Sequence, residues 1–212
     1  MQKLVPIALA LTFVACAKTQ DTTPATASPT NSATDTAAAI ATAPTGTESA
    51  VAPEVNPPGD IPDTQQFVKY TSSAGGYQLD VPEGWARKEN GANVQFASKY
   101  DGVAVNIATA TATAAPTAAS ARADQAKAIA AQGHATTITD VTDVSLPAGK
   151  AVLIKFASNS DPNAVTNKQV RLENEAYLFF TNGKIATLTL WAPQGADNVD
   201  QWKRMSKSFR WR

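Results

Sequence analysis

The chain has 212 residues, with 18 basic and 18 acidic side chains, one histidine and one cysteine. This balanced charge argues against a dedicated nucleic-acid-binding protein, which normally carries a large basic excess. A single cysteine with a single histidine excludes a zinc site of the Cys/His type, a disulfide framework and most nucleophile–base pairs of hydrolytic enzymes. We expect no metal and no cofactor.

The first 15 residues have the pattern of an export signal. Met1-Gln2-Lys3 is a short positive region, and residues 4–14 form an apolar run. Such a run is too short to cross a hydrocarbon core of about 30 Å, which requires about 20 helical residues. The segment is therefore predicted to be a signal peptide and not a transmembrane helix.

Cys16 follows the apolar run at the position where a bacterial lipobox has its lipidated cysteine. The small residue Ala15 precedes it, as in that motif, whereas Phe13 stands where leucine is usual. We expect cleavage before Cys16 and attachment to the membrane through lipid on Cys16. Ala17 permits sorting to an outer membrane if the envelope has two membranes. The alternative is ordinary signal-peptidase cleavage after Ala17, which would give a secreted soluble protein.

Residues 16–64 are predicted to be a disordered tether. Ala, Thr, Pro and Ser dominate, and residues 17–64 contain no aromatic side chain. Such a stretch cannot bury enough apolar surface to offset its chain entropy. Sixteen basic but only twelve acidic residues follow residue 64, so a mildly basic domain over residues 65–212 follows an acidic tether. The domain has the size of one ordinary folding unit.

The first half of the domain is predicted to contain four strands and a helix. The strands are expected over 67–71, 77–81, 94–96 and 103–108, with a turn over 82–85. Thr117 is placed to N-cap a helix that ends at Gly133. An alanine-rich face of this helix is expected to pack on a sheet; its members are Ala119, Ala123, Ala126, Ile129 and Ala130.

The second half is predicted to be four strands and a final helix. The strands are expected over 138–146, 151–157, 168–181 and 184–191, and Asn182-Gly183 favours a two-residue hairpin turn. Residues 177–180 are apolar on both faces, which predicts a central strand covered on both sides. The helix is expected over 197–208, with inward positions at Val199, Trp202, Met205 or Ser206, and Phe209. The order of elements predicts an α+β fold with an antiparallel sheet.

Two stretches of the domain carry a recognisable pattern. The first is Tyr77-x-Leu79-x-Val81-Pro82-x-Gly84-Trp85; the second contains Tyr177, Ala186-x-Leu188-x-Leu190, Pro193 and Met205-x-x-Ser208-Phe209. In these two stretches the domain resembles the PsbP-like superfamily. The superfamily includes extrinsic photosystem II subunits, a Ran-binding nuclear import factor and many bacterial envelope lipoproteins. The resemblance implies an α/β/α sandwich in which helices flank an antiparallel sheet. It also implies a domain without catalytic residues that acts by binding other proteins.

A few polar side chains are candidates for a site. His134 follows a predicted helix end, where a capping or solvent-exposed role is the usual one. Glu173 and Glu175 share one strand face and could hold a hard cation, although such pairs are usually solvated. Candidate partner-binding residues are Trp85 and the basic side chains of the last helix and its end, Lys203, Arg204, Lys207 and Arg210.

Together these features predict a non-enzymatic envelope lipoprotein with a protein-binding or assembly-type domain. Its expected partners are the membrane, through Cys16, and an envelope protein, but no nucleic acid. The alternative function is a small-ligand or envelope-polymer binding module with a pocket between sheet and helices. A deep pocket with convergent polar groups would favour that alternative.

Overall fold

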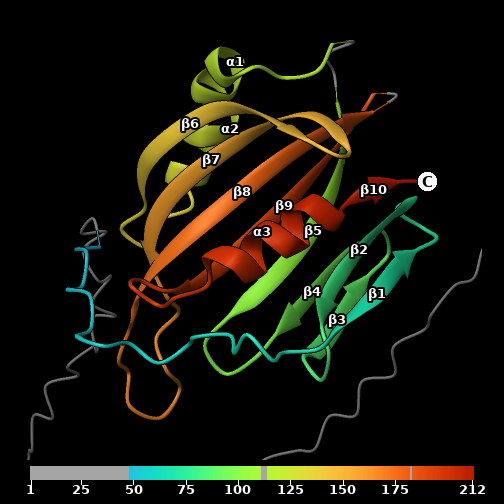
Figure 1. Cartoon of the computed structure of the whole chain (residues 1–212). Coiled ribbons are helices and arrows are strands. Elements are labelled where there is room, and N and C mark those ends of the chain that lie inside the picture. Colours follow the sequence, from blue (N-terminus) through green and yellow to red (C-terminus); the bar gives the residue numbers. More distant parts are fainter. Residues whose placement is uncertain (1–47, 111–113, 182) are drawn as a thin grey trace, which may run out of the picture. The chain divides into compact units, whose positions relative to one another are not determined.

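The computed structural model describes residues 48–110, 114–181 and 183–212, which belong to one compact unit. The predicted signal peptide, Cys16 and the tether up to residue 47 lie outside these residues. Within them, the fold is α+β, with two antiparallel sheets and three short helices (Figure 1).

The larger sheet has seven strands, and every neighbouring pair in it is antiparallel. At its centre the hairpin of β8 (Arg171–Thr181) and β9 (Lys184–Pro193) closes with Thr181 opposite Lys184, and Gly183 has a φ of +71°. The predicted two-residue turn is therefore confirmed. In sheet order the strands are β3 (Ala86–Asn90), β4 (Asn93–Ala97), β5 (Gly102–Thr109), β9 (Lys184–Pro193), β8 (Arg171–Thr181), β7 (Gly149–Asn159) and β6 (Thr137–Leu146).

The smaller sheet brings the two ends of the domain together. β1 (Phe67–Ser72) and β2 (Tyr77–Pro82) form the predicted pair of strands near the start of the domain. The chain returns after its last helix as β10 (Arg210–Trp211), which pairs with β2 through Trp211 opposite Tyr77. Neither β10 nor β3 was predicted, because a two-residue strand and a fully exposed strand have no apolar alternation to detect.

The helix predicted over 117–133 is instead two short helices, α1 (Ala118–Ala123) and α2 (Gln125–Ala130). The predicted N-cap is confirmed, since the Thr117 side chain accepts a hydrogen bond from the Ser120 N–H at 3.3 Å. The helix breaks at Asp124, whose φ of −114° and ψ of −76° depart from helical values.

The predicted buried face of this helical region was partly wrong. Ala119, Ala123 and Ala130 are exposed, whereas Ala118 and Ala121 are buried together with the correctly predicted Ala126. Because this segment has alanines on several sides of the helix, the sequence could not show which side faces the sheet. The break at Asp124 then shifts the phase between the two helices.

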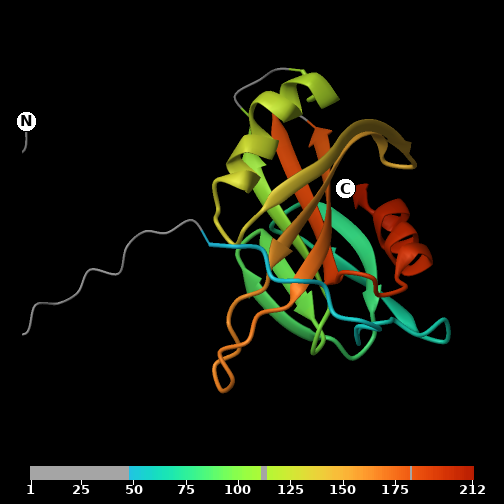
Figure 2. The ribbon, with the colours of Figure 1, turned by 90° about the vertical axis from the view of Figure 1, so that its left-hand side faces the viewer.

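Helices cover both faces of the seven-stranded sheet (Figure 2). α3 (Val199–Ser208) and the small sheet pack on one face, and α1 and α2 pack on the other. Along β8, Tyr177 and Phe179 belong to the cluster on the α3 side, while Ala176 and Leu178 belong to the cluster on the α1/α2 side. This arrangement confirms the predicted strand covered on both sides and the helix–sheet–helix layering.

An aromatic stack holds α3 between the two sheets. The Phe209 ring lies 4.2 Å from the Phe179 ring and 5.7 Å from the Tyr77 ring, centroid to centroid. Trp202, Met205 and Phe209 are buried as predicted, as is Ser206, but Val199 is 72% exposed. Val199 was wrongly placed inward because it begins the helix, beyond the part of α3 that packs on the small sheet.

Residues 48–66, which we call the strap, lie against the folded domain (Figure 1). The prediction that the tether extends to residue 64 therefore needs correction, because the described residues before 65 belong to the compact unit. Their composition is tether-like, and among them only Ile61 is a buried apolar residue. Amide side chains from distant parts of the chain hold them instead, which composition cannot reveal.

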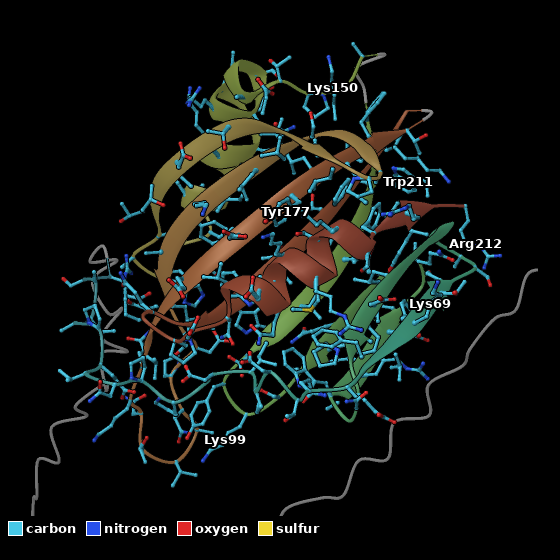
Figure 3. The ribbon with its side chains drawn as sticks, in the orientation of Figure 1. Lys69, Lys99, Lys150, Tyr177, Trp211 and Arg212 are labelled. Carbon is cyan, nitrogen blue, oxygen red and sulfur yellow. The ribbon has the colours of Figure 1, made fainter. Side chains whose placement is uncertain are left out.

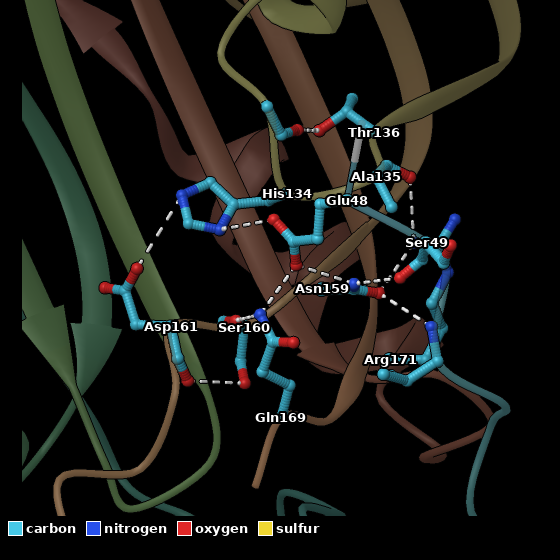
Figure 4. A network of polar contacts seen from close by, with 12 residues as sticks. Glu48, Ser49, His134, Ala135, Thr136, Asn159, Ser160, Asp161, Gln169 and Arg171 are labelled. Atoms are coloured by element: carbon cyan, nitrogen blue, oxygen red, sulfur yellow. Dashed lines mark hydrogen bonds and ion pairs between the residues drawn. The ribbon is translucent and has the colours of Figure 1, made fainter. Parts of the chain in front are cut away.

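The first end of the strap is held by Asn159 at the end of β7 (Figure 4). Its side-chain amide donates to the Glu48 carboxylate at 2.8 Å and to the Ser49 carbonyl at 2.9 Å, and its oxygen accepts from the Val51 N–H at 3.1 Å. Gln169 donates to the same Glu48 oxygen at 2.6 Å. The hydrogen bonds from Asn159 and then Gln169 hold the pKa of Glu48 below its usual value.

The other end of the strap is held by Asn198, just before α3. This buried side chain accepts from the Ile61 N–H at 2.6 Å and donates to the Gly59 carbonyl at 2.8 Å. Asp60 accepts from the Asp197 N–H at 2.8 Å beside it. The strap thus fixes the start of α3, which forms one wall of the site described below.

Candidate functional site

A groove of about 550 Å³ lies between α3 and the sheet face formed by β6, β7 and β8. Its floor is apolar toward the end of β6, where Val144, Leu146 and Leu153 line it, and charged along β7 and β8. Tyr177 lies on β8 between these two parts (Figure 3). The α3 wall is formed by side chains from all three turns of this short helix.

In the charged part of the floor, three side chains from β7 and β8 are joined by a hydrogen bond and an ion pair. The Tyr177 hydroxyl donates to one oxygen of Glu175 at 2.6 Å, and the Lys155 ammonium lies 2.9 Å from the other oxygen. The hydrogen bond to Glu175 raises the pKa of Lys155, while burial, reinforced by Glu175, raises the pKa of Tyr177. Both groups therefore stay protonated at neutral pH.

Glu173 lies on the same strand face as Glu175, as the sequence predicted, but its surroundings differ. No basic group among the described residues lies within ion-pair distance of it. Burial first, and the charge of Glu175 second, raise the pKa of Glu173, against the opposing effects of Lys155 and the Gly195 backbone. Glu173 is thus a half-buried carboxylate to which no cation from the described part of the chain is paired.

The two glutamates do not form a chelating pair. Both oxygens of Glu175 are engaged by Lys155 and Tyr177, so they are not free to join Glu173 around an ion. In the part of the chain that the structure describes, no group of three His, Cys, Asp or Glu side chains is arranged to hold a metal ion. The hard-cation hypothesis for this pair is not supported by its geometry.

The α3 wall of the groove combines a buried indole with two exposed cations. Trp202 is 6% exposed, and its indole N–H has no acceptor among the described residues. Lys203 and Lys207 are exposed on the rim, and no carboxylate in the described ranges pairs with them. With respect to the residues that the structure describes, the groove therefore offers an unpaired carboxylate on its floor and unpaired ammonium groups on its rim.

The structure separates the residues predicted to bind a partner. Lys203 and Lys207 line the groove. The Arg204 guanidinium instead lies 4.2 Å from the centre of the Phe67 ring. Arg210 donates at 2.6 Å to the carbonyls of Lys207 and Phe209, so it caps the end of α3.

Two further sequence candidates lie away from the groove or beyond the described residues. Trp85 is half-buried and packs against the main core. Cys16 lies outside the described residues, so the lipid attachment there stays a prediction. Within the described ranges, no helix has the length and apolarity needed to span a membrane.

His134 is part of the network around the strap (Figure 4). Its Nδ1 lies 3.9 Å from a Glu48 oxygen and its Nε2 lies 3.7 Å from an Asp161 oxygen. The two carboxylates face different ring nitrogens, so a single metal ion could not bind all three groups through these atoms. The partial exposure of the ring agrees with the predicted role near solvent.

Sequence reasoning missed the contribution of Lys155, Tyr177 and Trp202 to this site. Trp202 was assigned only to the core, and Tyr177 only to a central strand. Lys155 faces Glu175 because β7 and β8 pair in the register Lys155 opposite Glu175. The sequence shows that both residues lie in predicted strands, but it does not show the register that places them opposite each other.

Comparisons with known proteins identify the fold. No family model and no curated protein matches the chain. The solution structure of cyanobacterial PsbP from Synechocystis is similar, with a TM-score of 0.51 and 17% identity over 73% of this chain and 98% of that one. A crystal structure from Bacteroides thetaiotaomicron gives a TM-score of 0.44 and 10% identity over 68% of this chain and 48% of that one. The predicted resemblance is thus confirmed for the fold, which is PsbP-like.

Proposed function

We propose that this chain is a non-enzymatic, membrane-anchored envelope protein whose PsbP-like domain binds a partner protein at the groove beside α3. The observation that carries the proposal is the unpaired charge of the groove. Glu173 on the floor and Lys203 and Lys207 on the rim have no oppositely charged partner among the described residues. Complementary charges on a partner would supply specificity at such a surface.

The chemistry of the groove favours binding over catalysis. A lysine acts as a nucleophile or base only when it loses its proton, and Glu175 holds Lys155 in the charged form. The Tyr177 hydroxyl donates a hydrogen bond to Glu175 and keeps its proton at neutral pH. Glu173 is the carboxylate of the groove that has no paired cation among the described residues, which suits the binding of a cationic group.

The membrane anchor is proposed from the signal-like start of the chain and Cys16. Two or more acyl chains on this cysteine would hold the domain at the membrane durably, and Ala17 permits the outer membrane where there are two. Metabolic labelling with a fatty-acid probe should label the chain, and Cys16→Ser should abolish the label. Label that persists in the variant would contradict lipid attachment at Cys16, and no label in the wild type would leave the secreted form cleaved after Ala17.

Photo-crosslinking in intact cells tests the partner-binding role. Val199 on the groove rim and Val165 in the β7–β8 loop are matched probes, since they are exposed apolar residues 72% and 92% accessible. A benzoylphenylalanine at position 199 should give a discrete protein adduct that the same probe at position 165 does not give. No protein adduct at 199, or the same adduct from both positions, would contradict the proposal.

The size of the groove favours one second candidate function. A volume of about 550 Å³ lies in the range of about 300–1,000 Å³ typical of small-ligand sites. If the probe at Val199 captures only lipid or glycan, the domain is a small-ligand or envelope-polymer binding module. The same experiment therefore decides between the two functions.

A further inference from the structure

The charged side chains of the groove differ in whether an oppositely charged group is paired with them. Lys155 and Glu175 neutralise each other at 2.9 Å, with Tyr177 donating to the second carboxylate oxygen. Glu173, one position along the same face, has no such partner among the described residues. A partly buried carboxylate without a cation has lost part of its hydration and has gained no ion pair in return. Any occupant that brings a cation to this point is therefore favoured.

The indole of Trp202 adds a second unmet demand. Its side chain lines the groove and is 6% exposed, yet its N–H has no acceptor in the described residues. A buried donor without an acceptor has lost its hydration and has gained no hydrogen bond in return. Among the described residues, the buried Trp202 N–H thus lacks an acceptor, and Glu173 lacks a cation, which an occupant of the groove could bring.

A bare metal ion does not meet these demands. A hard cation needs six or more oxygen ligands, and the Glu175 oxygens are already occupied. An ion would also leave most of a 550 Å³ groove empty, including the apolar part around Leu146 and Leu153. A peptide supplies apolar side chains and a charged side chain on a single chain.

The rim sets a limit on the charge of that peptide. Lys203 and Lys207 stand over the groove without acidic partners among the described residues, and a run of basic residues would be repelled by them. One basic residue that reaches past the rim to Glu173 avoids this repulsion. Its aliphatic stem could lie along the apolar surface of the wall.

Resting on the proposed function, we propose that the groove holds an extended segment of a partner protein that carries a single Lys or Arg, with the charged group of that residue paired to Glu173. The rest of the segment is apolar or acidic. Its apolar side chains lie toward Leu146, and its acidic ones lie toward Lys203 and Lys207.

The test begins with the adduct formed from the benzoylphenylalanine at position 199. Mass spectrometry of the adduct should identify a captured segment that contains one Lys or Arg. The purified partner should then bind Glu173→Gln at least about tenfold more weakly than wild type, the size of a lost charged hydrogen bond. Glu83→Gln, which alters an exposed carboxylate after β2, is the matched control and should bind as wild type.

Two further measurements separate pairing from mere disturbance of the fold. Reversing the partner's basic residue to Glu should restore binding to Glu173→Lys. Wild-type affinity should also fall as acid protonates Glu173, and Glu173→Gln should lack that part of the pH dependence. A captured segment without Lys or Arg, or equal affinity of Glu173→Gln and wild type, overturns this inference but leaves partner binding intact. The absence of any protein adduct at position 199 overturns both.

Discussion

The two faces of the seven-stranded sheet are covered by different means. On the α1/α2 side the buried cluster is formed largely by small and β-branched side chains: Ala118, Ala121, Ala126, Val141, Val152, Ile154, Ala176 and Leu178. On the α3 side it contains the stacked rings of Tyr77, Phe179 and Phe209, with Trp202 and Met205 beside them. Alanine lets a helix lie close to a sheet but buries little area, so most of the burial comes from the α3 side.

The polar contacts follow the same division. α1 is fixed to the edge strand by two hydrogen bonds, from the Ala118 N–H to Asp143 at 2.8 Å and from Arg122 to the Val141 carbonyl. On the other face, charged side chains of β7 and β8 stay uncovered by α3 and form the floor of the groove. One face is thus closed by its helices, whereas the other keeps an open, charged surface that can receive a partner.

The largest effect on stability is expected at Phe209. Its ring is fully buried and stacks on Phe179 at 4.2 Å, on Tyr77 at 5.7 Å and edge-on against Trp211 at 5.4 Å. Phe209→Ala should lower the free energy of unfolding by about 3–5 kcal/mol, because it leaves a cavity where α3 and both sheets meet. Urea denaturation followed by tryptophan fluorescence measures this. A loss below about 1.5 kcal/mol would show that the stack is not the main support of this face.

Leu178 provides the corresponding test of the opposite face. It is fully buried among the alanines of α1 and α2. Leu178→Ala should cost about 2–3 kcal/mol, less than Phe209→Ala, because two six-residue helices can settle toward the sheet and reduce the cavity. The same denaturation experiment compares both variants. An equal or larger loss at Leu178 would contradict the difference we draw between the faces.

The sequence predicted those elements in which local pattern and final environment agree. Tyr77, Leu79 and Val81 alternate with polar residues, and all three are buried on one face of β2. It missed β3, where Arg87, Lys88 and their neighbours are all exposed at the edge of the sheet. Charged residues at an edge strand discourage pairing with other chains, so such a strand lacks the pattern by which strands are detected.

The site was predictable only in part for a similar reason. Lys203 and Lys207 follow from the helical period of α3, which places them opposite its buried residues. The Lys155–Glu175 pair depends on the register of β7 against β8, and the fixed start of α3 depends on Asn198 meeting a segment 137 positions away. Contacts over such distances are set by the assembled fold and not by local pattern.

Asn198 tests how much the α3 face depends on the strap. Asn198→Ala would leave the Ile61 N–H and the Gly59 carbonyl without their partner, at a cost of about 1–3 kcal/mol. Hydrogen exchange at the Ile61 amide should become faster, while the Val51 amide, held by Asn159, should keep its protection. If both amides lose protection together, the strap is one cooperative unit and its two ends are not held independently.

The smallest expected effect on stability is at Asp101, and the direction of its pH dependence follows from the pKa of this group. Its carboxyl group lies beneath the start of α3, where burial, with a contribution from Asp60, raises its pKa to about 6 against hydrogen bonds from Ser98 and Asn198. The folded state therefore holds this proton more tightly than the unfolded chain, whose aspartates titrate near pH 4. The stabilisation by this group is present at low pH and is lost as the pH rises from about 4 to about 6.

Asp101→Asn should remove that loss, since an amide can accept from Asn198 and donate to Ser98 without ever becoming charged. Relative to wild type, the variant should gain about 1–2 kcal/mol of stability between pH 4 and pH 7. The difference between the two unfolding curves isolates Asp101 from the other carboxyl groups. Asp124→Asn, at an exposed carboxyl between α1 and α2 with no side-chain capping bond, is the matched control and should show no such gain. A pH-independent difference for Asp101→Asn would mean that the carboxyl near α3 is solvated, and that the polar side of this face extends beneath the helix as well as beside it.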